Sequence, residues 1–475
     1  MKKAQSSVEF ITLIGFAIAG FAILLMAFEG QMVNTERNIE FTRTEEVFNI
    51  IQEEIRFAYN SPYNYKRSFE LPPSINNEDY TISFDDGVEV ALTVKGNDYV
   101  YFLSHEVGGE DLVIGTNTVQ KFCELGECTI YLNVDDVSPS AIGISNCEAL
   151  QNMQNNLSAH YYLTNNINCA ETSDWNEGEG FVPIGDDTNP FEGILDGRGN
   201  KISDLYINRS DSSRQGLFGE LRDATIRNIY LEDFDITGES VGGLSRVATD
   251  EVTIVNVHVT GNFFSTEGSH NSALIGLIRE ISSSGGTQII NSSVDATVIH
   301  DSNTGGWHTG LLVGTIRGDF GLINSSFARG YVEGRNVGGL IGNFDDSTSI
   351  VSNSYSQANV TGINNAGYGA GGLIGRINGG APTILNSYTV SEVSTTEGTS
   401  GGLIGLTTSS GSPTITSSYW DTDVGPGTST GGEEMSTSDM QNITTYTDWN
   451  ISTLEDYTNE IWVIQENDYP RLAWE

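Results

Sequence analysis

The sequence predicts a mainly β protein, in which a hydrophobic N-terminal helix and a small antiparallel β domain precede a parallel β-helix, or solenoid. Three observations support this prediction. The 475 residues include 54 Gly but only 10 Pro, two sequence landmarks recur in the same order, and an apolar run lies close to the N-terminus. A short β repeat cannot bury its own apolar face, so we expect successive repeats to stack into a solenoid.

The charge of the chain comes from a shortage of basic residues. There are 63 Asp and Glu against 22 Lys and Arg, a net charge of −41, and no Lys follows Lys201. Binding to nucleic acid requires a basic face that neutralises phosphates, so we expect no nucleic-acid partner. The composition is typical of a soluble, self-repelling surface, of a surface rich in bound cations, or of a protein that works in high salt.

The N-terminus has the features of a membrane-targeting segment. Lys2 and Lys3 precede an uncharged run over residues 10–28. At about 1.5 Å per residue this run is long enough to cross a hydrocarbon core of about 30 Å. The two lysines are expected to stay in the cytoplasm, which places the rest of the chain outside the cell.

Four residues after Met1–Ala4 fit a Q-x-S-x-E-x-x-x-L pattern: Gln5, Ser7, Glu9 and Leu13. This pattern, directly before the apolar run, resembles the class III signal peptides of archaeal type IV pilin-like proteins. The resemblance implies that a prepilin peptidase cuts between Ala4 and Gln5, and that residues 1–4 are a leader peptide. Residues 5–30 would then form a transmembrane or filament-core helix that packs against other pilin-like subunits. The alternative is a plain signal anchor.

A helix and a small β domain are expected next. Phe48, Ile51, Ile55 and Tyr59 share one helical face, which predicts an amphipathic helix within residues 31–65. Residues 66–140 contain short alternating strands joined by turns that include Gly, which predicts a small antiparallel domain of the pilin-like kind. Nothing in this part indicates catalysis.

Four cysteines in an exported chain indicate two disulfides, for which three connectivities exist. Local pairing is the simplest choice, and it joins Cys123 to Cys128 and Cys147 to Cys169. A zinc site is the alternative, but the spacings are unsuitable and no His lies beside these cysteines.

The repeats occupy the second half of the chain. An x-G-G-L-I-G run occurs at Val337, Ala370 and Ser400, and looser copies begin at Gln215, Val241, Ser272 and Gly310. The second landmark, with Ser417 in the seventh place, is an Asn: Asn228, Asn256, Asn291, Asn324, Asn353 and Asn386. Stacked repeats would align these side chains in a hydrogen-bonded ladder. Tyr355, Tyr388 and Tyr419 would form a second column.

The run V-G-G-L-I-G resembles the GLUG motif of surface and adhesin-like repeat proteins. The resemblance implies a parallel β-helix over residues 141–420 and a C-terminal cap over residues 421–475. It carries information about the fold and little about activity, because one fold supports many functions.

We expect no enzymatic activity. The acidic residues fall at different positions of the repeat, no Lys follows Lys201, and no H-E-x-x-H run is present. We therefore expect no cofactor, except that the Asp421-x-Asp423-x-Gly425 spacing resembles the opening of a calcium loop. A polar turn is the alternative interpretation of that spacing.

Together these features predict a cell-surface, pilin-like adhesin or surface-display protein. Residues 10–28 would anchor it in the membrane or in an extracellular pilus-like filament, and the β-helix would bind extracellular glycans or proteins. Two alternatives remain: a membrane-tethered carbohydrate-active enzyme with a β-helix fold, and a single-span anchored surface protein that does not assemble into filaments.

Overall fold

The computed structural model describes residues 41–475, apart from 60–64, 77, 86–88, 104–106, 110–111, 125–126, 134–140, 282–285, 302–306, 320, 364–366 and 455–459. The chain divides into two compact units, residues 1–139 and 140–475. The predicted leader and apolar span lie outside the described residues. Among the residues that are described, no helix has both the length and the apolar character needed to cross a membrane.

The first unit combines a helix over residues 41–59 with two small sheets. One sheet is an antiparallel meander of β2 (Tyr80–Asp85), β3 (Glu89–Val94) and β4 (Asn97–Phe102), and the other has the order β1 (Lys66–Leu71), β6 (Gly115–Glu124), β7 (Glu127–Leu132) and β5 (Val107–Gly109).

The helix packs on this unit through one apolar face. Phe48, Ile51 and Ile55 are buried in the core shared with the sheets, whereas Tyr59, which the sequence pattern placed on the same face, is 46% exposed. Cys123 and Cys128 lie directly opposite each other in the β6–β7 hairpin.

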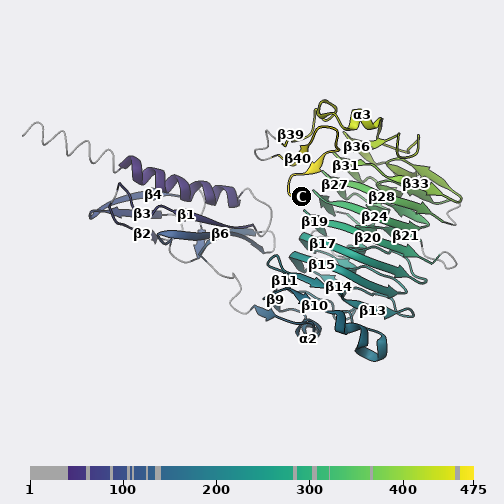
Figure 1. Ribbon diagram of the computed structural model, residues 1–475, viewed down its shortest axis with the longest axis horizontal. Helices are drawn as coiled ribbons and strands as arrows, with labels where there is room; N and C mark the ends of the chain where they lie inside the picture. Colours follow the sequence, from purple (N-terminus) through teal and green to yellow (C-terminus); the bar gives the residue numbers. More distant parts are fainter. Residues whose placement is uncertain are drawn as a thin grey trace, which may run out of the picture. The chain divides into compact units, whose positions relative to one another are not determined.

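The second unit is a parallel β-solenoid with three sheets (Figure 1). One sheet has seven strands: β14 (Phe218–Arg222), β16 (Ser245–Thr249), β18 (Ile275–Arg279), β22 (Val313–Arg317), β26 (Ile341–Ser347), β30 (Ile374–Gly380) and β35 (Ile404–Thr407). A four-stranded sheet contains β21 (His308–Gly310), β25 (Asn336–Gly338), β29 (Gly369–Gly371) and β34 (Thr399–Gly401).

The third sheet runs the length of the solenoid. In chain order, it contains β8 (Ile142–Ile144), β9 (His160–Leu163), β10 (Ile167–Asn168), β11 (Ile194–Asp196), β12 (Lys201–Ser203), β13 (Tyr206–Arg209), β15 (Thr225–Gly238), β17 (Thr253–Ser265), β19 (Gln288–Ile290), β20 (Ser293–His300), β23 (Leu322–Asn324), β24 (Phe327–Gly334), β27 (Ile350–Ser352), β28 (Tyr355–Gly362), β31 (Thr383–Leu385), β32 (Tyr388–Thr389), β33 (Glu392–Thr395), β36 (Thr414–Thr416), β37 (Tyr419–Asp421) and β38 (Glu433–Met435). Each strand pairs in parallel with its counterpart in the next coil. The predicted mainly β fold with a parallel solenoid is confirmed.

The repeated motif fills the core and allows the coils to approach. In Val337–Gly342, Leu340 and Ile341 are fully buried. A Cβ on Gly338 would lie 2.0 Å from the carbonyl oxygen of Ile341 and 2.6 Å from the backbone nitrogen of Gly375. Only Gly leaves room for the backbone at this position.

The Asn landmarks mark a corner in which the backbone is left-handed. The corner residues have φ between 44° and 56°, a region that Asn tolerates well: Asn228, Asn256, Asn291, Ser325, Asn353, Asn386 and Ser417. Asn324 is one residue ahead of this column, and Ser325 takes the corner in its coil. The Asn side chains nevertheless form hydrogen bonds between coils. Asn353 donates to Oδ1 of Asn324 over 3.0 Å, and Asn256 donates to Oδ1 of Asn228 over 3.1 Å.

A serine ladder runs beside the Asn corner. From the second member onward, each buried hydroxyl accepts a hydrogen bond of 3.2–3.3 Å from the backbone N–H of the serine one coil earlier. The first hydroxyl, that of Ser292, accepts from the backbone N–H of Val257 over 3.2 Å. Each hydroxyl also donates to the carbonyl oxygen two residues before it, over 2.7–3.0 Å. The ladder consists of Ser292, Ser326, Ser354, Ser387 and Ser418. It satisfies backbone groups that the turn leaves without a β-ladder partner.

An aromatic column lies on the same sheet. The rings of Tyr355 and Tyr388 stack with centroids 4.9 Å apart, and Tyr419 follows in register, so the predicted tyrosine column is confirmed. The C-terminal cap covers this column with α3 (Thr437–Met440), η3 (Ile443–Thr445), β39 (Ile451–Thr453), β40 (Trp462–Ile464) and β41 (Arg471–Leu472).

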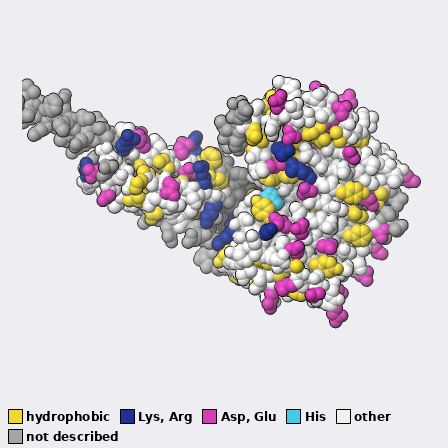
Figure 2. Space-filling model, in the orientation of Figure 1, with side chains coloured by type: hydrophobic (Ala, Val, Ile, Leu, Met, Phe, Trp, Pro, Cys, Tyr) yellow, Lys and Arg dark blue, Asp and Glu magenta, His cyan; other side chains and the backbone are white. Residues whose placement is uncertain are grey.

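Acidic side chains dominate the surface of the solenoid. Figure 2 shows Asp and Glu scattered over the visible face of the solenoid, with few Lys and Arg among them. The few basic groups are therefore informative about local function, because each one interrupts an otherwise anionic surface.

Candidate binding pocket

The solenoid opens with a short helical cap. In this cap α2 (Cys147–Gln151) is followed by η1 (Asn152–Asn155), and the side chain of Asn146 caps α2 by accepting from the backbone N–H of Ala149. The amide of Gln151 then pairs with the backbone of Val182, donating over 2.8 Å and accepting over 2.9 Å. This double contact fixes the cap against the first coil.

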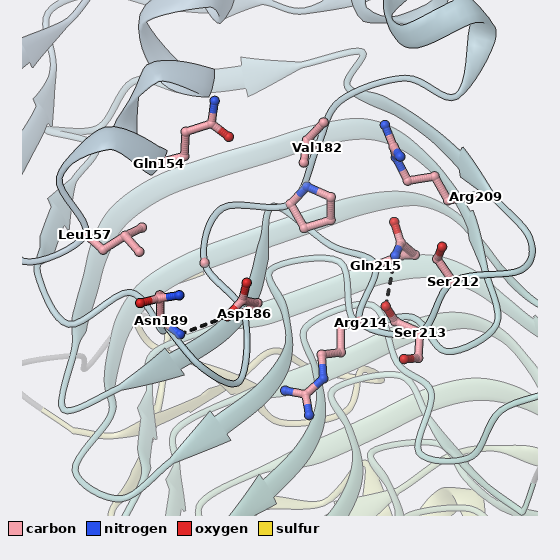
Figure 3. A pocket seen from close by; sticks show the side chains of 12 residues that line it. Gln154, Leu157, Val182, Asp186, Asn189, Arg209, Ser212, Ser213, Arg214 and Gln215 are labelled. Carbon is pink, nitrogen blue, oxygen red and sulfur yellow. Dashed lines mark hydrogen bonds between the residues drawn. The ribbon is translucent and has the colours of Figure 1, made fainter.

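Between the cap and the first coil lies a pocket of about 670 Å³ (Figure 3). Its wall combines polar and apolar surface and comes from three segments: Gln154, Leu157, Val182, Pro183, Gly185, Asp186, Asn189, Arg209, Ser212, Ser213, Arg214 and Gln215. Figure 3 shows Gln215, Ser212 and Ser213 on one side, opposite Leu157 and Asn189. We call this site the cap pocket.

One wall of the cap pocket is a rigid turn. Oδ1 of Asp186 accepts hydrogen bonds from the backbone N–H groups of Thr188 and Asn189, each over 2.8 Å. Gly185 precedes the turn with φ of 73°, which favours Gly. The turn thereby holds the Asn189 side chain at the pocket.

Two arginines line the opposite wall. Arg209 donates to Oε2 of Glu179 over 2.6 Å and to the carbonyl of Phe181 over 3.4 Å. Arg214 contacts Glu220 and lies 3.3 Å from Asp187. The backbone of Arg214 is left-handed, with φ of 71°, an uncommon conformation for a side chain of this kind.

Behind Arg214 is a cluster of guanidinium groups around one buried carboxylate. Glu220 is fully buried in β14, and its oxygens contact Arg214, Arg222 and Arg279, with distances of 3.3 Å to Arg222 and 2.9 Å to Arg279. Thr249 donates to the same carboxylate over 3.0 Å. Parallel register on β14, β16 and β18 brings these side chains from three successive coils together.

Arg246 completes the cluster. It follows Val241-Gly-Gly-Leu-Ser245, in the place where the regular copies of the motif have their last Gly. Arg246 is 9% exposed and donates from one terminal nitrogen to the carbonyl of Ser269 over 2.9 Å, while its Nε and Nη1 are buried without a hydrogen-bond partner among the described residues. Burial lowers the pKa of Arg246 to about 10, and Arg214 and Arg279 add to this shift. We call Arg214, Arg222, Arg246, Arg279 and Glu220 the arginine cluster.

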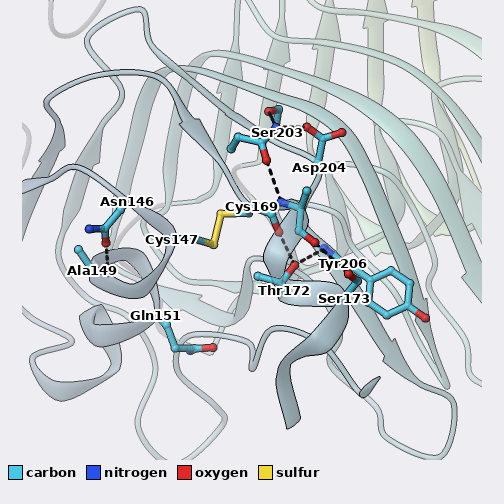
Figure 4. The surroundings of a disulfide bond; sticks show 12 residues. Asn146, Cys147, Ala149, Gln151, Cys169, Thr172, Ser173, Ser203, Asp204 and Tyr206 are labelled. Carbon is cyan, nitrogen blue, oxygen red and sulfur yellow. Dashed lines mark hydrogen bonds between the residues drawn. A yellow bond between two sulfur atoms is a disulfide. The ribbon is translucent and has the colours of Figure 1, made fainter. Parts of the chain in front are cut away.

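A disulfide anchors the start of the solenoid (Figure 4). It joins Cys147 to Cys169 across a sequence separation of 22. The backbone N–H of Cys169 donates to the carbonyl of Ser203 over 2.7 Å, and the hydroxyl of Thr172 accepts from the backbone N–H of Tyr206 over 2.9 Å. The disulfide therefore ties the cap to the strands that carry the cap pocket. The predicted Cys147–Cys169 pair is present, and the side chains of Cys123 and Cys128 lie outside the described ones.

The other predicted site residues have structural surroundings. Oδ1 of Asp421 accepts from the backbone N–H of Asp423 over 2.8 Å, and its second oxygen accepts from Thr437 and Tyr469 over 2.7 and 2.6 Å. These bonds make the Asp421 segment a polar turn within the C-terminal cap. The predicted processing residues, Ala4, Gln5, Ser7, Glu9 and Leu13, lie outside the described residues.

Sequence reasoning missed the cap pocket and the arginine cluster. One signal was available, because Arg246 replaces a motif Gly in a region where basic residues are scarce. The remaining members come from different coils, and their convergence depends on the register between coils. A period read from the sequence does not give that register residue by residue.

Comparison with known proteins links this region to a peptidase family. Residues 138–261 match the model of the M26 IgA1-specific metallo-endopeptidase N-terminal region, and this range contains the whole cap pocket. A solved structure of a putative immunoglobulin A1 protease from Bacteroides ovatus covers 70% of this chain and 92% of its own, with 20% identity and a TM-score of 0.47.

Curated relatives resemble parts of the chain. Halomucin of Haloquadratum walsbyi is 33% identical over 166 residues, which are 34% of this chain and 2% of halomucin. The immunoglobulin A1 protease of Streptococcus sanguinis is 29% identical over 226 residues, 46% of this chain and 11% of the protease. A putative Gly-rich membrane protein of Evansella cellulosilytica is 36% identical over 103 residues, 21% of this chain and 12% of that protein. The chain thus spans a small fraction of each curated relative.

These similarities link parts of the chain to halomucin and to immunoglobulin A1 protease-like proteins, and they correct one prediction. The expectation that the chain is not an enzyme is contradicted by the match to a peptidase family and by the similarity to an immunoglobulin A1 protease. Among the described residues, no group of three or more His, Cys, Asp or Glu side chains is placed to hold a metal ion. The described residues therefore do not fit the metal centre that a metallo-endopeptidase requires.

Proposed function

We propose that this chain is a surface-displayed recognition protein whose solenoid binds extracellular glycans or proteins through the cap pocket. The observation that carries the proposal is the cap pocket itself, with a volume of about 670 Å³ and a wall that includes two arginines. Loops held on a rigid scaffold are the usual place for recognition. The disulfide and the Gln151 contact supply that rigidity.

Binding arrays test this function. The full-length chain is applied to arrays of glycans and of extracellular proteins, beside two variants that each place a Trp on an exposed Ser. Ser212→Trp fills the cap pocket, whereas Ser410→Trp changes a turn near the other end of the solenoid. We expect Ser212→Trp to abolish binding and Ser410→Trp to retain it. Equal binding by both variants would remove the cap pocket from the proposal.

We also propose that the chain reaches the surface by the pilin route. The support is the Q-x-S-x-E-x-x-x-L pattern directly before the apolar run of residues 10–28. Sequencing the mature N-terminus tests this route, and we expect Gln5 as the first residue. Recovery of chains that still begin at Met1 would instead support a single-span anchor that stays outside filaments.

Proteolysis is a second candidate function, favoured by the family match over residues 138–261. The name of the Streptococcus sanguinis relative specifies immunoglobulin A1 as the substrate of that protease. Incubating the full-length chain with immunoglobulin A1, followed by mass spectrometry of the products, tests this candidate. Defined cleavage products would support it, and an intact substrate after prolonged incubation would count against it.

A further inference from the structure

The arginine cluster concentrates positive charge in an acidic molecule. Eleven arginines follow Lys201 in the sequence, and four of them, Arg214, Arg222, Arg246 and Arg279, lie within the arginine cluster. The chain as a whole has a net charge of −41. Four arginines gathered at one place in such an acidic chain indicate that positive charge is needed at that place.

The arginine cluster holds four guanidinium groups and one carboxylate. Arg246 and Glu220 are its buried members, whereas the side chains of Arg214, Arg222 and Arg279 are 27–31% exposed. Glu220 is the fully buried carboxylate within it, and it faces three of the four guanidinium groups. The further acidic partners are exposed: the side chain of Asp187 is 60% exposed, and that of Glu192 is 44% exposed and 4.0 Å from Arg222. Exposed pairs of this kind contribute about 0–1 kcal/mol each. The cluster as a whole therefore carries an excess of positive charge.

Arg246 is the least compensated member of the cluster. Its Nε and Nη1 are buried and find no hydrogen-bond partner within the described part of the chain. A Cβ on Gly276 would lie 2.9 Å from Cδ of Arg246, so the side chain lies against the backbone of the next coil and Gly276 makes room for it. A buried guanidinium with unused donors is costly to the folded chain. An anion that binds nearby would reduce that cost.

The cap pocket is the cavity that lies next to the arginine cluster. Arg214 belongs to both, since it lines the pocket and contacts Glu220. Beside it, Gln215 is 3% exposed, and no described residue donates a hydrogen bond to its Oε1. The left-handed backbone of Arg214 is a further sign that this position is held in place by its surroundings.

The rest of the pocket wall matches a carbohydrate. The amides of Asn189 and Gln154 and the hydroxyls of Ser212 and Ser213 can both donate to and accept from sugar hydroxyl groups. A short apolar strip of Leu157, Val182 and Pro183 suits the C–H face of a pyranose ring.

We propose that the cap pocket binds an acidic sugar, with the sugar carboxylate accepting hydrogen bonds from Arg214 and with Arg246 acting as a positioning residue that keeps this wall cationic. This inference rests on the proposed recognition function of the cap pocket and assigns its ligand class. Bidentate geometry favours Arg over Lys for a planar carboxylate.

A pair of sugars that differ in charge tests the ligand class. Binding of trigalacturonate and of neutral galactotriose to the full-length chain is measured by calorimetry in 0.1 M NaCl. We expect trigalacturonate to bind at least tenfold more tightly and to lose affinity in 1 M NaCl, because its charge is screened there. Equal affinity for both sugars, or binding that is insensitive to salt, would overturn the inference. An excess of sodium sulfate distinguishes a sugar site from a general anion site, since only a general anion site would be emptied.

Variants of Arg246 test its positioning role. Arg246→Gln removes the charge and Arg246→Lys keeps it, while Arg471→Gln is a matched control in the C-terminal cap, where the Arg side chain is 56% exposed. We expect Arg246→Gln to lower the ratio of acidic to neutral affinity at least fivefold, and Arg246→Lys and Arg471→Gln to preserve it. A preserved ratio in folded Arg246→Gln would refute the role of Arg246. Arrays that show Ser212→Trp-sensitive binding of neutral ligands alone would refute the acidic ligand and leave the recognition function intact.

Discussion

Glu220 and Arg246 are neighbours in one cluster but make opposite contributions to it. Glu220 is a fully buried carboxylate that three guanidinium groups and one hydroxyl satisfy. Arg246 is a buried cation whose Nε and Nη1 lack partners among the residues that the structure describes. Replacing Glu220 would leave several guanidinium groups without their shared carboxylate, which lowers the stability of the folded chain. Replacing Arg246 removes a charge that has no such partner, so we expect only a small loss of stability. Glu220 therefore serves the stability of the fold, whereas the proposed role of Arg246 is in ligand binding.

We predict that Glu220→Gln lowers the free energy of unfolding by about 3–5 kcal/mol, because three guanidinium groups lose their common carboxylate. Urea denaturation measures the change. Glu179→Gln is the matched control, since the side chain of Glu179 is 59% exposed in its pair with Arg209, and we expect about 1 kcal/mol or less. A similar loss in both variants would show that the buried network has no special role.

A histidine pair beside the cluster makes the stability sensitive to pH. The rings of His270 and His308 stack with centroids 5.2 Å apart, and Nδ1 of His308 accepts a hydrogen bond from Asn336 over 3.0 Å. Burial lowers the pKa of His308 to about 4, with Arg376 and Arg317 lowering it further and Asp345 opposing them. The folded chain therefore keeps His308 neutral in mildly acidic solution.

We predict that the free energy of unfolding decreases as the pH falls from about 6.5, the ordinary pKa of His, towards 4. In this window the unfolded chain takes up a proton that folded His308 does not, so the loss is up to about 1.4 kcal/mol per pH unit for this residue. His308→Asn, which places the residue of the next coil at this position, should reduce the slope. Urea denaturation between pH 8 and 4.5 measures it, and parallel curves for the two proteins would contradict the prediction.

At the scale of elements, the aromatic column shows how the C-terminal cap is held. The register runs from Tyr230 through His258, Ser293 and Phe327, so one coil has a small residue in the aromatic position. Trp474 fills that gap, with ring centroids 5.3 Å from His258 and 5.5 Å from Phe327. The column is therefore continuous in space although the sequence interrupts it.

We predict that Trp474→Ala destabilises the C-terminal cap by about 2 kcal/mol, roughly half of the ~3–5 kcal/mol expected for a fully buried Trp, because Trp474 is partly exposed. Hydrogen exchange would show faster exchange in β40 and β41. Trp307→Ala is the control, since Trp307 is 46% exposed on another sheet edge and its loss should leave the cap unchanged. Unchanged exchange in Trp474→Ala would show that other contacts hold the cap.

The sequence predicts elements better than it predicts their contacts. The repeated Gly motif and the Asn landmarks were enough for a parallel solenoid, because their spacing follows the coil. Ser325 rather than Asn324 occupies the left-handed corner in one coil, since Ser also tolerates this turn. The sequence does not reveal the serine ladder, because Ser is common throughout the chain and its ladder positions do not stand out. Trp474 reaches the column from far along the chain, and no local pattern encodes such a contact.

At the scale of the whole molecule, the acidic charge works against the compact state. With a net charge of −41, surface carboxylates repel one another across distances that salt screens, from about 10 Å at 0.1 M to about 3 Å at 1 M. The fully buried carboxylate of Glu220 is screened much less than these surface charges. Salt should therefore relieve repulsion at the surface and leave the strongest internal ion pairs in place.

We predict that raising NaCl from 0.1 to 1 M at pH 7 increases the melting temperature, by about 2–4 °C for each 1 kcal/mol of repulsion removed. The control is the same comparison near pH 4.2, the isoelectric point of the sequence, where surface repulsion is cancelled and salt should have little effect. Calorimetric scans in both buffers measure the difference. A melting temperature that falls with salt at pH 7 would mean that exposed ion pairs outweigh the repulsion between carboxylates, and that the sparse arginines stabilise the surface more than its excess charge destabilises it.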